Sequence, residues 1–224
     1  MKKIKQEINL KNVNYKNLLS HFTALRPLNG LIKKDSWEKA AFLLKQGMIG
    51  VIPTGTIYGI VGKALDKEVV EKIYKLKKRS LKKPMMILIS SQNELKKFGV
   101  KISQEQKKIL EKIWSEKVSI ILDCPLKKFS YLHRNKNSLA FRIPKKKKLL
   151  KTLLRTGPLV ASSANQESKP YATTIAQAKK YFNNKIFYLN EGKINSKPST
   201  LVKLTKNKLE ILRLGAEKIN LKNF

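Results

Sequence analysis

The chain has 224 residues, of which 42% are hydrophobic, and this composition suits one α/β domain and excludes a wholly disordered chain. The uncharged stretch at residues 48–62 is too short to cross a membrane, and a single cysteine, Cys124, excludes both a disulfide framework and a cysteine zinc site. The 49 Lys and Arg residues against 15 Asp and Glu residues give a formal net charge of +34, which fits a polyanionic partner or a lysine-rich background equally well.

Residues 1–34 are polar and rich in Lys and Asn, which predicts an N-terminal extension before a domain at residues 35–219. This N-terminal segment develops no apolar stretch, so we expect no secretory signal and a cytoplasmic location. At the start of the domain, Asp35 and Glu38 predict the N-cap and capping-box partner of a first helix, and Gly47 predicts its end.

Hydrophobic patterns then predict the remaining elements in chain order. They are strands at 48–53 and 56–62, a helix at 66–78, a strand at 85–90, a helix at 103–114, strands at 118–123 and 139–143, a helix at 145–155, a strand at 159–162, a helix at 174–182, and strands at 186–189, 199–204 and 209–214. Strands and helices alternate, but several strands follow one another directly near the end. This order predicts an α/β fold with a twisted, mixed sheet and helices packed on it.

Three long stretches lack Asp and Glu altogether: residues 47–65, 72–93 and 139–166. The second and third carry seven Lys and Arg residues each. A site built from these stretches would suit phosphate groups and would offer a metal ion few carboxylate ligands.

Polar side chains follow two of the predicted strands. Thr54 and Thr56 flank Gly55 after the first strand, and Ser162, Ser163 and Asn165 follow the strand at 159–162. Ligands of α/β folds bind at strand ends, where hydroxyl and amide groups can orient phosphate or ribose. Either segment alone is equally compatible with an ordinary turn.

The helix at 66–78 combines an apolar stripe with a basic end. Val70, Ile73, Tyr74 and Lys77 follow the helical repeat, which places Lys77 on the inward face, while Lys75 lies off it. Lys77 could therefore send its ammonium group into a cleft beside Arg79, or extend it into water as surface lysines commonly do.

These segments, in this order, resemble the YrdC-like family of L-threonylcarbamoyl-AMP synthases. The family's P-T-[DE]-T-x-Y-G is similar to residues 53–59, its L-K-x-R-P…K-P to residues 76–84, and its A-x-R-x-P to residues 140–144. Its S-A-N resembles residues 163–165, its P-S-T residues 198–200, and its L-R-x-G residues 212–215. Six ordered matches span most of the chain.

The resemblance implies an enzyme that condenses L-threonine, bicarbonate and ATP into threonylcarbamoyl-AMP and pyrophosphate for tRNA threonylcarbamoyladenosine modification. It also implies a twisted, mostly parallel sheet with flanking helices and a concave basic cleft. Mg²⁺ would be held mainly through the ATP phosphates, and tRNA and threonylcarbamoyl-transferase proteins are possible partners. The implied ATP-binding residues are Lys77, Arg79, Ser163, Asn165 and Arg213, with Lys77 and Arg79 catalytic, and the implied threonine-binding residues are Thr54, Arg142 and Ser199.

The chain departs from the family pattern at four places. Gly55 replaces an acidic residue, Ser80 replaces a proline, residues 115–118 replace a P-G-P-containing segment, and residues 166–169 lack the usual glycine. These departures leave open an alternative, a non-catalytic nucleotide- or RNA-binding paralogue with the same fold.

Overall fold

The computed structural model describes residues 36–114, 117–206 and 208–220, without the side chain of Lys185. The predicted extension at residues 1–34, Asp35 and residues 115–116 lie outside this part of the chain, so the division at residue 35 stays a prediction. No helix in the described part is both long and apolar enough to cross a membrane.

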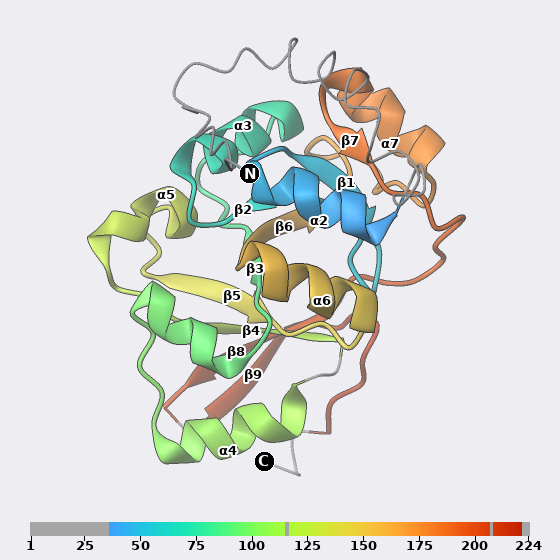
Figure 1. Ribbon diagram of the computed structural model, residues 1–224. Helices are drawn as coiled ribbons and strands as arrows, with labels where there is room; N and C mark the ends of the chain where they lie inside the picture. The colour runs from blue at the N-terminus through green and yellow to red at the C-terminus, as the bar shows by residue number, and fades with distance from the viewer. Residues whose placement is uncertain (1–35, 115–116, 207, 221–224) are drawn as a thin grey trace, which may run out of the picture. The chain divides into compact units, whose positions relative to one another are not determined.

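In the described part of the chain, nine strands form one sheet, and their bounds follow the predicted strands closely (Figure 1). The strands are β1 (Gly50–Pro53), β2 (Tyr58–Lys63), β3 (Met86–Leu88), β4 (Val118–Asp123), β5 (Ser138–Arg142), β6 (Leu159–Ser163), β7 (Phe187–Tyr188), β8 (Thr200–Thr205) and β9 (Lys208–Arg213). Their order across the sheet is β7-β1-β2-β6-β3-β5-β4-β8-β9.

The sheet is mixed, as predicted, but the expectation of a mostly parallel sheet is wrong. Of the eight strand pairings described, only β1–β7, β3–β5 and β4–β8 are parallel, and the other five are antiparallel. Short connections between successive strands, as in β1–β2 and β8–β9, force the chain to reverse, because a parallel pair needs a long crossover.

Six α-helices and three short 3₁₀ segments flank the sheet in the described part of the chain. They are α2 (Trp37–Lys45), α3 (Lys67–Lys77), η2 (Gln92–Phe98), α4 (Gln104–Ile113), η3 (Lys127–Phe129), α5 (Ser130–His133), α6 (Lys147–Thr156), α7 (Ile175–Phe182) and η4 (Asn183–Lys185). The first helix is capped by Ser36, one residue later than predicted, because the Ser36 hydroxyl accepts the N–H of Lys39. The helical flank of the sheet is confirmed.

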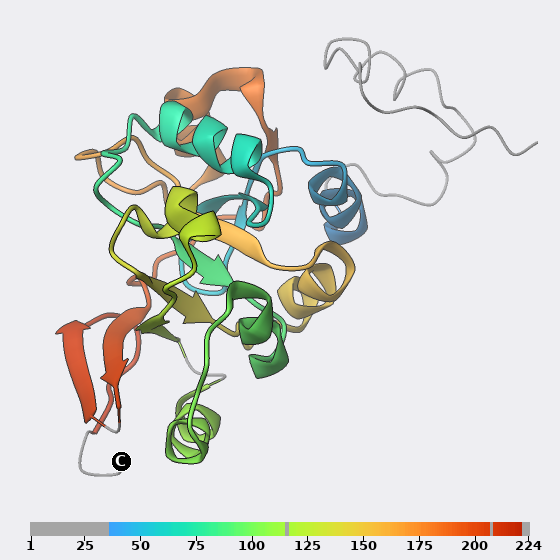
Figure 2. The same ribbon diagram turned by 90° about the vertical axis from the view of Figure 1, so that its left-hand side faces the viewer.

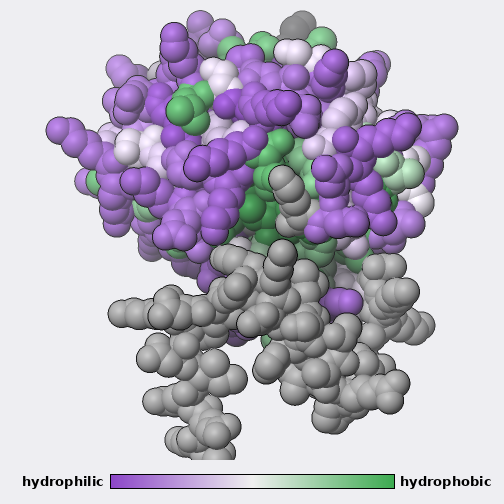
Figure 3. All heavy atoms as spheres, turned by 90° about the horizontal axis from the view of Figure 1, so that it is seen from above, coloured by the Kyte–Doolittle hydropathy of each residue, from purple (hydrophilic) through white to green (hydrophobic). Residues whose placement is uncertain are grey.

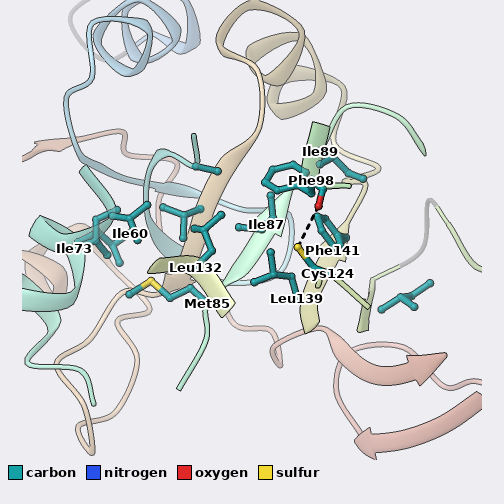
Figure 4. Packing of buried hydrophobic residues seen from close by; sticks show 14 of the residues in the cluster. Ile60, Ile73, Met85, Ile87, Ile89, Phe98, Cys124, Leu132, Leu139 and Phe141 are labelled. Atoms are coloured by element: carbon teal, nitrogen blue, oxygen red, sulfur yellow. Dashed lines mark hydrogen bonds between the residues drawn. The ribbon is translucent and has the colours of Figure 1, made fainter. Parts of the chain in front are cut away.

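Two hydrophobic clusters hold these layers together. The larger one packs α3, α4, α5 and α7 against the sheet, and Figure 4 shows part of it around Phe98, Phe141 and Leu139. Cys124 is fully buried in this cluster, where its thiol donates to the Phe98 carbonyl at 3.3 Å. Cys124 is therefore a packing residue of the core.

The smaller cluster packs α2 and α6 against the strands β1, β2 and β6. In Figure 2 these two helices lie at the right of the view, and the β8–β9 hairpin forms the edge of the sheet at the lower left. Seen from above, the described surface is mostly hydrophilic with small hydrophobic areas (Figure 3), as expected for a chain with this charge. The helices α2 and α6 leave part of their sheet face uncovered, and the candidate site lies there.

Candidate active site

A cleft of about 660 Å³ lies on the sheet and gathers residues from seven strands and their connections. Its lining includes Arg79, Lys136, Arg142, Lys203 and Arg213 but no Asp or Glu. The expected concave, basic cleft is therefore present, and its charge suits an anionic ligand.

The strand period of two explains how the sheet presents these groups. Ser138, Ala140 and Arg142 alternate along β5 and face the cleft, while Leu139 and Phe141 face the larger hydrophobic cluster. Ser119 on β4 lines the same face. One face of each strand thus builds the core and the other carries polar groups.

Arg142 is the most deeply buried cation of the cleft, with 2% of its surface exposed. Its Nη1 donates to Thr56 Oγ1 at 3.1 Å and its Nη2 donates to the Thr54 carbonyl, while Nε has no partner. Burial lowers the pKa of Arg142 to about 10, so the guanidinium stays charged at neutral pH. No carboxylate pairs with it among the described residues, so its positive charge is not neutralised by a neighbouring side chain.

Thr54 lies in the tight turn between β1 and β2. Its hydroxyl donates to the Ile57 carbonyl at 2.8 Å, and Gly55 next to it has φ +87°, a left-handed conformation that favours glycine. A side chain at position 55 would point toward Arg142, since a Cβ at this position would lie 3.9 Å from Arg142 Nη2. The turn therefore links the predicted threonine-binding Thr54 to Arg142.

Lys77 lies on the inward face of α3, as the helical spacing predicted, with 1% of its surface exposed. Its ammonium group donates to the carbonyls of Ser163 and Asn165, at 2.6 Å each, and to Asn165 Oδ1 at 3.3 Å. Burial, with the nearby charge of Arg79, lowers the pKa of Lys77 to about 7. Lys77 does not line the cleft and instead holds the loop that follows β6.

Arg79 does line the cleft, and its guanidinium is anchored from behind. Its Nε donates to the carbonyl of Lys83 at 3.0 Å and its Nη2 to that of Pro84 at 2.9 Å. An arginine has five N–H donors, so several remain for a ligand.

Ser163 and Asn165 bond to each other after β6. The Ser163 hydroxyl donates to Asn165 Oδ1 at 2.6 Å, and Asn165 Nδ2 donates to the Lys169 carbonyl at 2.5 Å. Ser163 lines the cleft, whereas Asn165 lies behind it. The side chain of Asn165 therefore stabilises the loop after β6 through its hydrogen bonds to Ser163 and Lys169.

The opposite wall brings Ser199 and Arg213 together. Arg213 Nη2 donates to the Ser199 carbonyl at 2.8 Å, and the Ser199 hydroxyl lies 2.7 Å from that of Ser119. Burial lowers the pKa of Arg213. Six predicted site residues thus line one cleft: Thr54, Arg79, Arg142, Ser163, Ser199 and Arg213.

Sequence reasoning missed several residues around the cleft. Ser119, Lys136 and Lys203 line it but were not assigned to the site. A polar residue between two apolar ones, at 118–120 on β4 and 202–204 on β8, was the only local signal for Ser119 and Lys203. Glu167 was also missed, and it accepts the backbone N–H of Ser80 at 2.5 Å. Ser80 can donate this hydrogen bond because it has a backbone N–H, which the proline usual at this position in the family would lack.

The donor set of the cleft does not build a metal site by itself. Within the described residues, no group of three His, Cys, Asp or Glu side chains could hold a metal ion. This fits a divalent cation that arrives with phosphate groups and keeps water ligands.

Comparison with known proteins places these features in a family. The model of the Sua5_yciO_yrdC family, described as "Telomere recombination", matches residues 42–215. A Methanocaldococcus jannaschii protein provisionally named threonylcarbamoyl-AMP synthase is 33% identical over 78% of this chain and 84% of its own length.

A Pyrococcus abyssi threonylcarbamoyl-AMP synthase is 28% identical over 79% of this chain, which spans about half, 53%, of that longer protein. The crystal structure of P. abyssi Sua5 complexed with L-threonine is similar, with a TM-score of 0.72 and 27% identity over 80% of this chain and 54% of that one. The fold, the ordered motifs and these matches agree, and the chain belongs to the Sua5/YciO/YrdC family.

Proposed function

We propose that this chain is a threonylcarbamoyl-AMP synthase, which condenses L-threonine, bicarbonate and ATP into threonylcarbamoyl-AMP and pyrophosphate. The observation that carries the proposal is the cleft itself, which joins five cationic side chains and several hydroxyl groups with no carboxylate in its lining. The names of the M. jannaschii and P. abyssi relatives support the synthase over a non-catalytic paralogue.

The charges of the cleft fit this reaction. Bicarbonate takes up a proton and gives carbon dioxide and water, and the neutral amino group of threonine adds to the carbon dioxide and loses a proton to leave a carbamate. A carbamate oxygen attacks the α-phosphorus of ATP as the bond to pyrophosphate breaks. Negative charge grows on the phosphoryl oxygens and on the departing pyrophosphate. Fixed cations that line the cleft stabilise that charge, because they need no reorganisation as the reaction proceeds.

We assign roles to the predicted residues by their contacts. Arg79 and Arg213 contact phosphate oxygens with their remaining N–H groups, and Ser163 orients a phosphate or the ribose. Arg142 binds the carboxylate of threonine, near Thr54 and Ser199. Lys77 and Asn165 support ATP binding from behind by holding the loop after β6.

Mg²⁺ binds with ATP through the phosphates and water. The product supplies threonylcarbamoyl-transferase proteins that modify tRNA, with tRNA itself a possible direct contact. The location is cytoplasmic, which the single, reduced cysteine fits.

Mass detection of threonylcarbamoyl-AMP, after incubation with all three substrates and Mg²⁺, tests the proposed function. We expect the product with the unchanged protein, none when threonine or bicarbonate is omitted, and a loss of at least about tenfold with Arg142→Met, since a charge-assisted contact is removed. Arg155→Met, which changes an exposed arginine of α6, is the control. ATP binding without any product would reject the synthase in favour of the paralogue.

A second experiment tests the role of the α3 lysine. Lys77→Ala should weaken ATP binding at least about tenfold in a calorimetric titration, because the loop carrying Ser163 loses its anchor. Lys75→Ala removes an exposed lysine of the same helix and should leave the affinity unchanged. Equal effects of the two substitutions would contradict the assignment.

A further inference from the structure

Glu167 connects two segments that border the nucleotide side of the cleft. Its Oε2 accepts the N–H of Ser80 and its Oε1 accepts Lys83 Nζ, at 2.5 Å each. Its own N–H donates to the Lys77 carbonyl at 2.9 Å. Glu167, in the loop after β6, thus contacts both the end of α3 and the turn that follows α3.

A second link runs between the same segments in the opposite direction. Lys77 reaches from α3 to the carbonyls of Ser163 and Asn165, whereas Glu167 reaches from the loop back to Ser80 and Lys83. The two segments are therefore joined by reciprocal side-chain contacts. A pair of links restrains both the distance and the angle between segments, which one link cannot do.

The turn that Glu167 holds also anchors Arg79. The guanidinium donates to the carbonyls of Lys83 and Pro84, and the Lys83 N–H donates to the Ser80 carbonyl at 3.2 Å. Glu167 contacts this turn at both of its ends, Ser80 and Lys83. A change in its carboxylate would therefore move the platform on which Arg79 rests.

A carboxylate so close to phosphate-binding groups could instead act by repelling ATP. The contacts argue against this, because both oxygens are occupied by donors and Lys83 supplies a compensating charge. The hydrogen bonds from Lys83 and Ser80, with the charges of Lys83 and Arg79, hold the pKa of Glu167 below its usual range. The carboxylate is thus ionised and already neutralised.

We propose that Glu167 is a positioning residue of the nucleotide site, which fixes Arg79 relative to Ser163 by clamping the turn at residues 80–84. The inference rests on the proposed function, since it assigns ATP to this side of the cleft. It concerns a carboxylate that itself contacts no nucleotide.

The sign of the effect on ATP affinity separates positioning from repulsion. We expect Glu167→Ala to raise the calorimetric Kd and the KM for ATP about tenfold, as for the loss of a charge-assisted contact, with an unchanged KM for threonine. Glu167→Gln keeps an acceptor for Ser80 but loses the ion pair, so its Kd for ATP should lie between those of the unchanged protein and Glu167→Ala. Lys83→Met should weaken ATP binding, and the double variant with Glu167→Ala should be no worse than Glu167→Ala alone.

Glu111→Gln, at an exposed acid of α4, serves as the matched control. Tighter ATP binding by Glu167→Gln, or a lowered melting temperature with an unchanged Kd for ATP, would overturn the positioning role alone. Failure of the unchanged protein to bind ATP would overturn the proposed function and this inference together. Measuring the Kd directly keeps the two cases apart, because it does not depend on turnover.

Discussion

The ammonium group of Lys77 donates to three oxygen atoms, and burial of the side chain, with the nearby charge of Arg79, lowers its pKa to about 7. The unfolded chain holds this proton up to a pH near the ordinary value of 10.5. Between these pH values the unfolded state binds more protons than the folded state, so the stability of the protein should rise with pH. Below pH 7 the cost of burying the charge is fully present.

Urea unfolding at pH 6 and pH 9 checks this expectation. The free energy of unfolding of the unchanged protein, minus that of Lys77→Met, should increase between the two pH values. Lys75→Met is the control, because an exposed lysine keeps its ordinary titration and should leave the pH dependence unchanged. The same difference at both pH values would contradict the lowered pKa of Lys77.

Gly55 leaves the threonine side of the cleft without a negative charge. A carboxylate here would lie near Arg142 and could orient the ammonium group of threonine, so Gly55→Asp should lower the KM for threonine. At a φ of +87°, any residue other than glycine strains the backbone at position 55. Gly55→Asn is therefore the proper reference, because asparagine has the shape of aspartate without its charge. Relative to it, we expect a gain of about five- to thirtyfold, or roughly 1–2 kcal/mol.

Pyrophosphate release over a threonine series measures this gain. An equal KM for the Asp and Asn variants would show that a negative charge at position 55 has no effect on threonine binding. Loss of activity in both would instead show that the turn tolerates only glycine.

At the scale of single residues, the sequence predicted which side chains lie in one cleft, but it did not predict the hydrogen-bond partners of each side chain. Thr54, Arg142 and Arg213 come from three separate motifs and line one cleft, because each motif follows or ends a strand. Lys77 was expected on phosphate, but its hydrogen bonds to backbone carbonyls depend on a loop 86 residues away. No local pattern encodes such a contact, and Glu167 was missed for the same reason.

Helix α3 owes its position to a close approach at Gly62 on β2. A Cβ at residue 62 would lie 2.4 Å from Val69 Cγ1 and 3.1 Å from Ile73 Cδ1. Gly62→Ala should therefore push α3 from the sheet, lower the free energy of unfolding by about 1–3 kcal/mol, and weaken ATP binding through Lys77.

Val69→Ala removes the clashing methyl group and provides the test of this mechanism. The double variant Gly62→Ala, Val69→Ala should be more stable in urea than the sum of the single effects predicts. Strictly additive effects of the two substitutions would show that Gly62→Ala destabilises the protein for another reason, for example through the backbone freedom of glycine.

Among the elements, hydrophobic patterns located the strands well, and β4 has the predicted bounds, Val118–Asp123. The helices predicted to start at residues 66 and 103 also start there, with Asp66 and Ser103 as the N-caps of α3 and α4. The direction of pairing was not predictable, because it depends on which strands meet across the sheet. The short segments η2 and α5 were missed, since four to seven residues give too little periodicity to read.

For the molecule as a whole, a formal charge of +34 must attract RNA to some degree. If most of this charge is a lysine-rich background, tRNA binding should be weak and should fall at least about tenfold between 50 and 200 mM salt, because bound counterions are released. Filter binding over a salt series measures the slope. A tight complex that resists salt and discriminates among tRNA sequences would favour a dedicated RNA-binding surface.

The parallel pairings of β1 with β7 and of β4 with β8 also govern how the chain can fold during synthesis. Gly50 pairs with Phe187 and Val118 with Thr200, so both closures wait for residues that leave the ribosome late. Contacts of such separation form slowly, since a long loop must be closed first. Until β8 and β9 emerge, β4 presents an open edge that is rich in hydrophobic residues. The nascent chain should therefore be most prone to aggregate just before the wall bearing Ser199 and Arg213 completes the cleft.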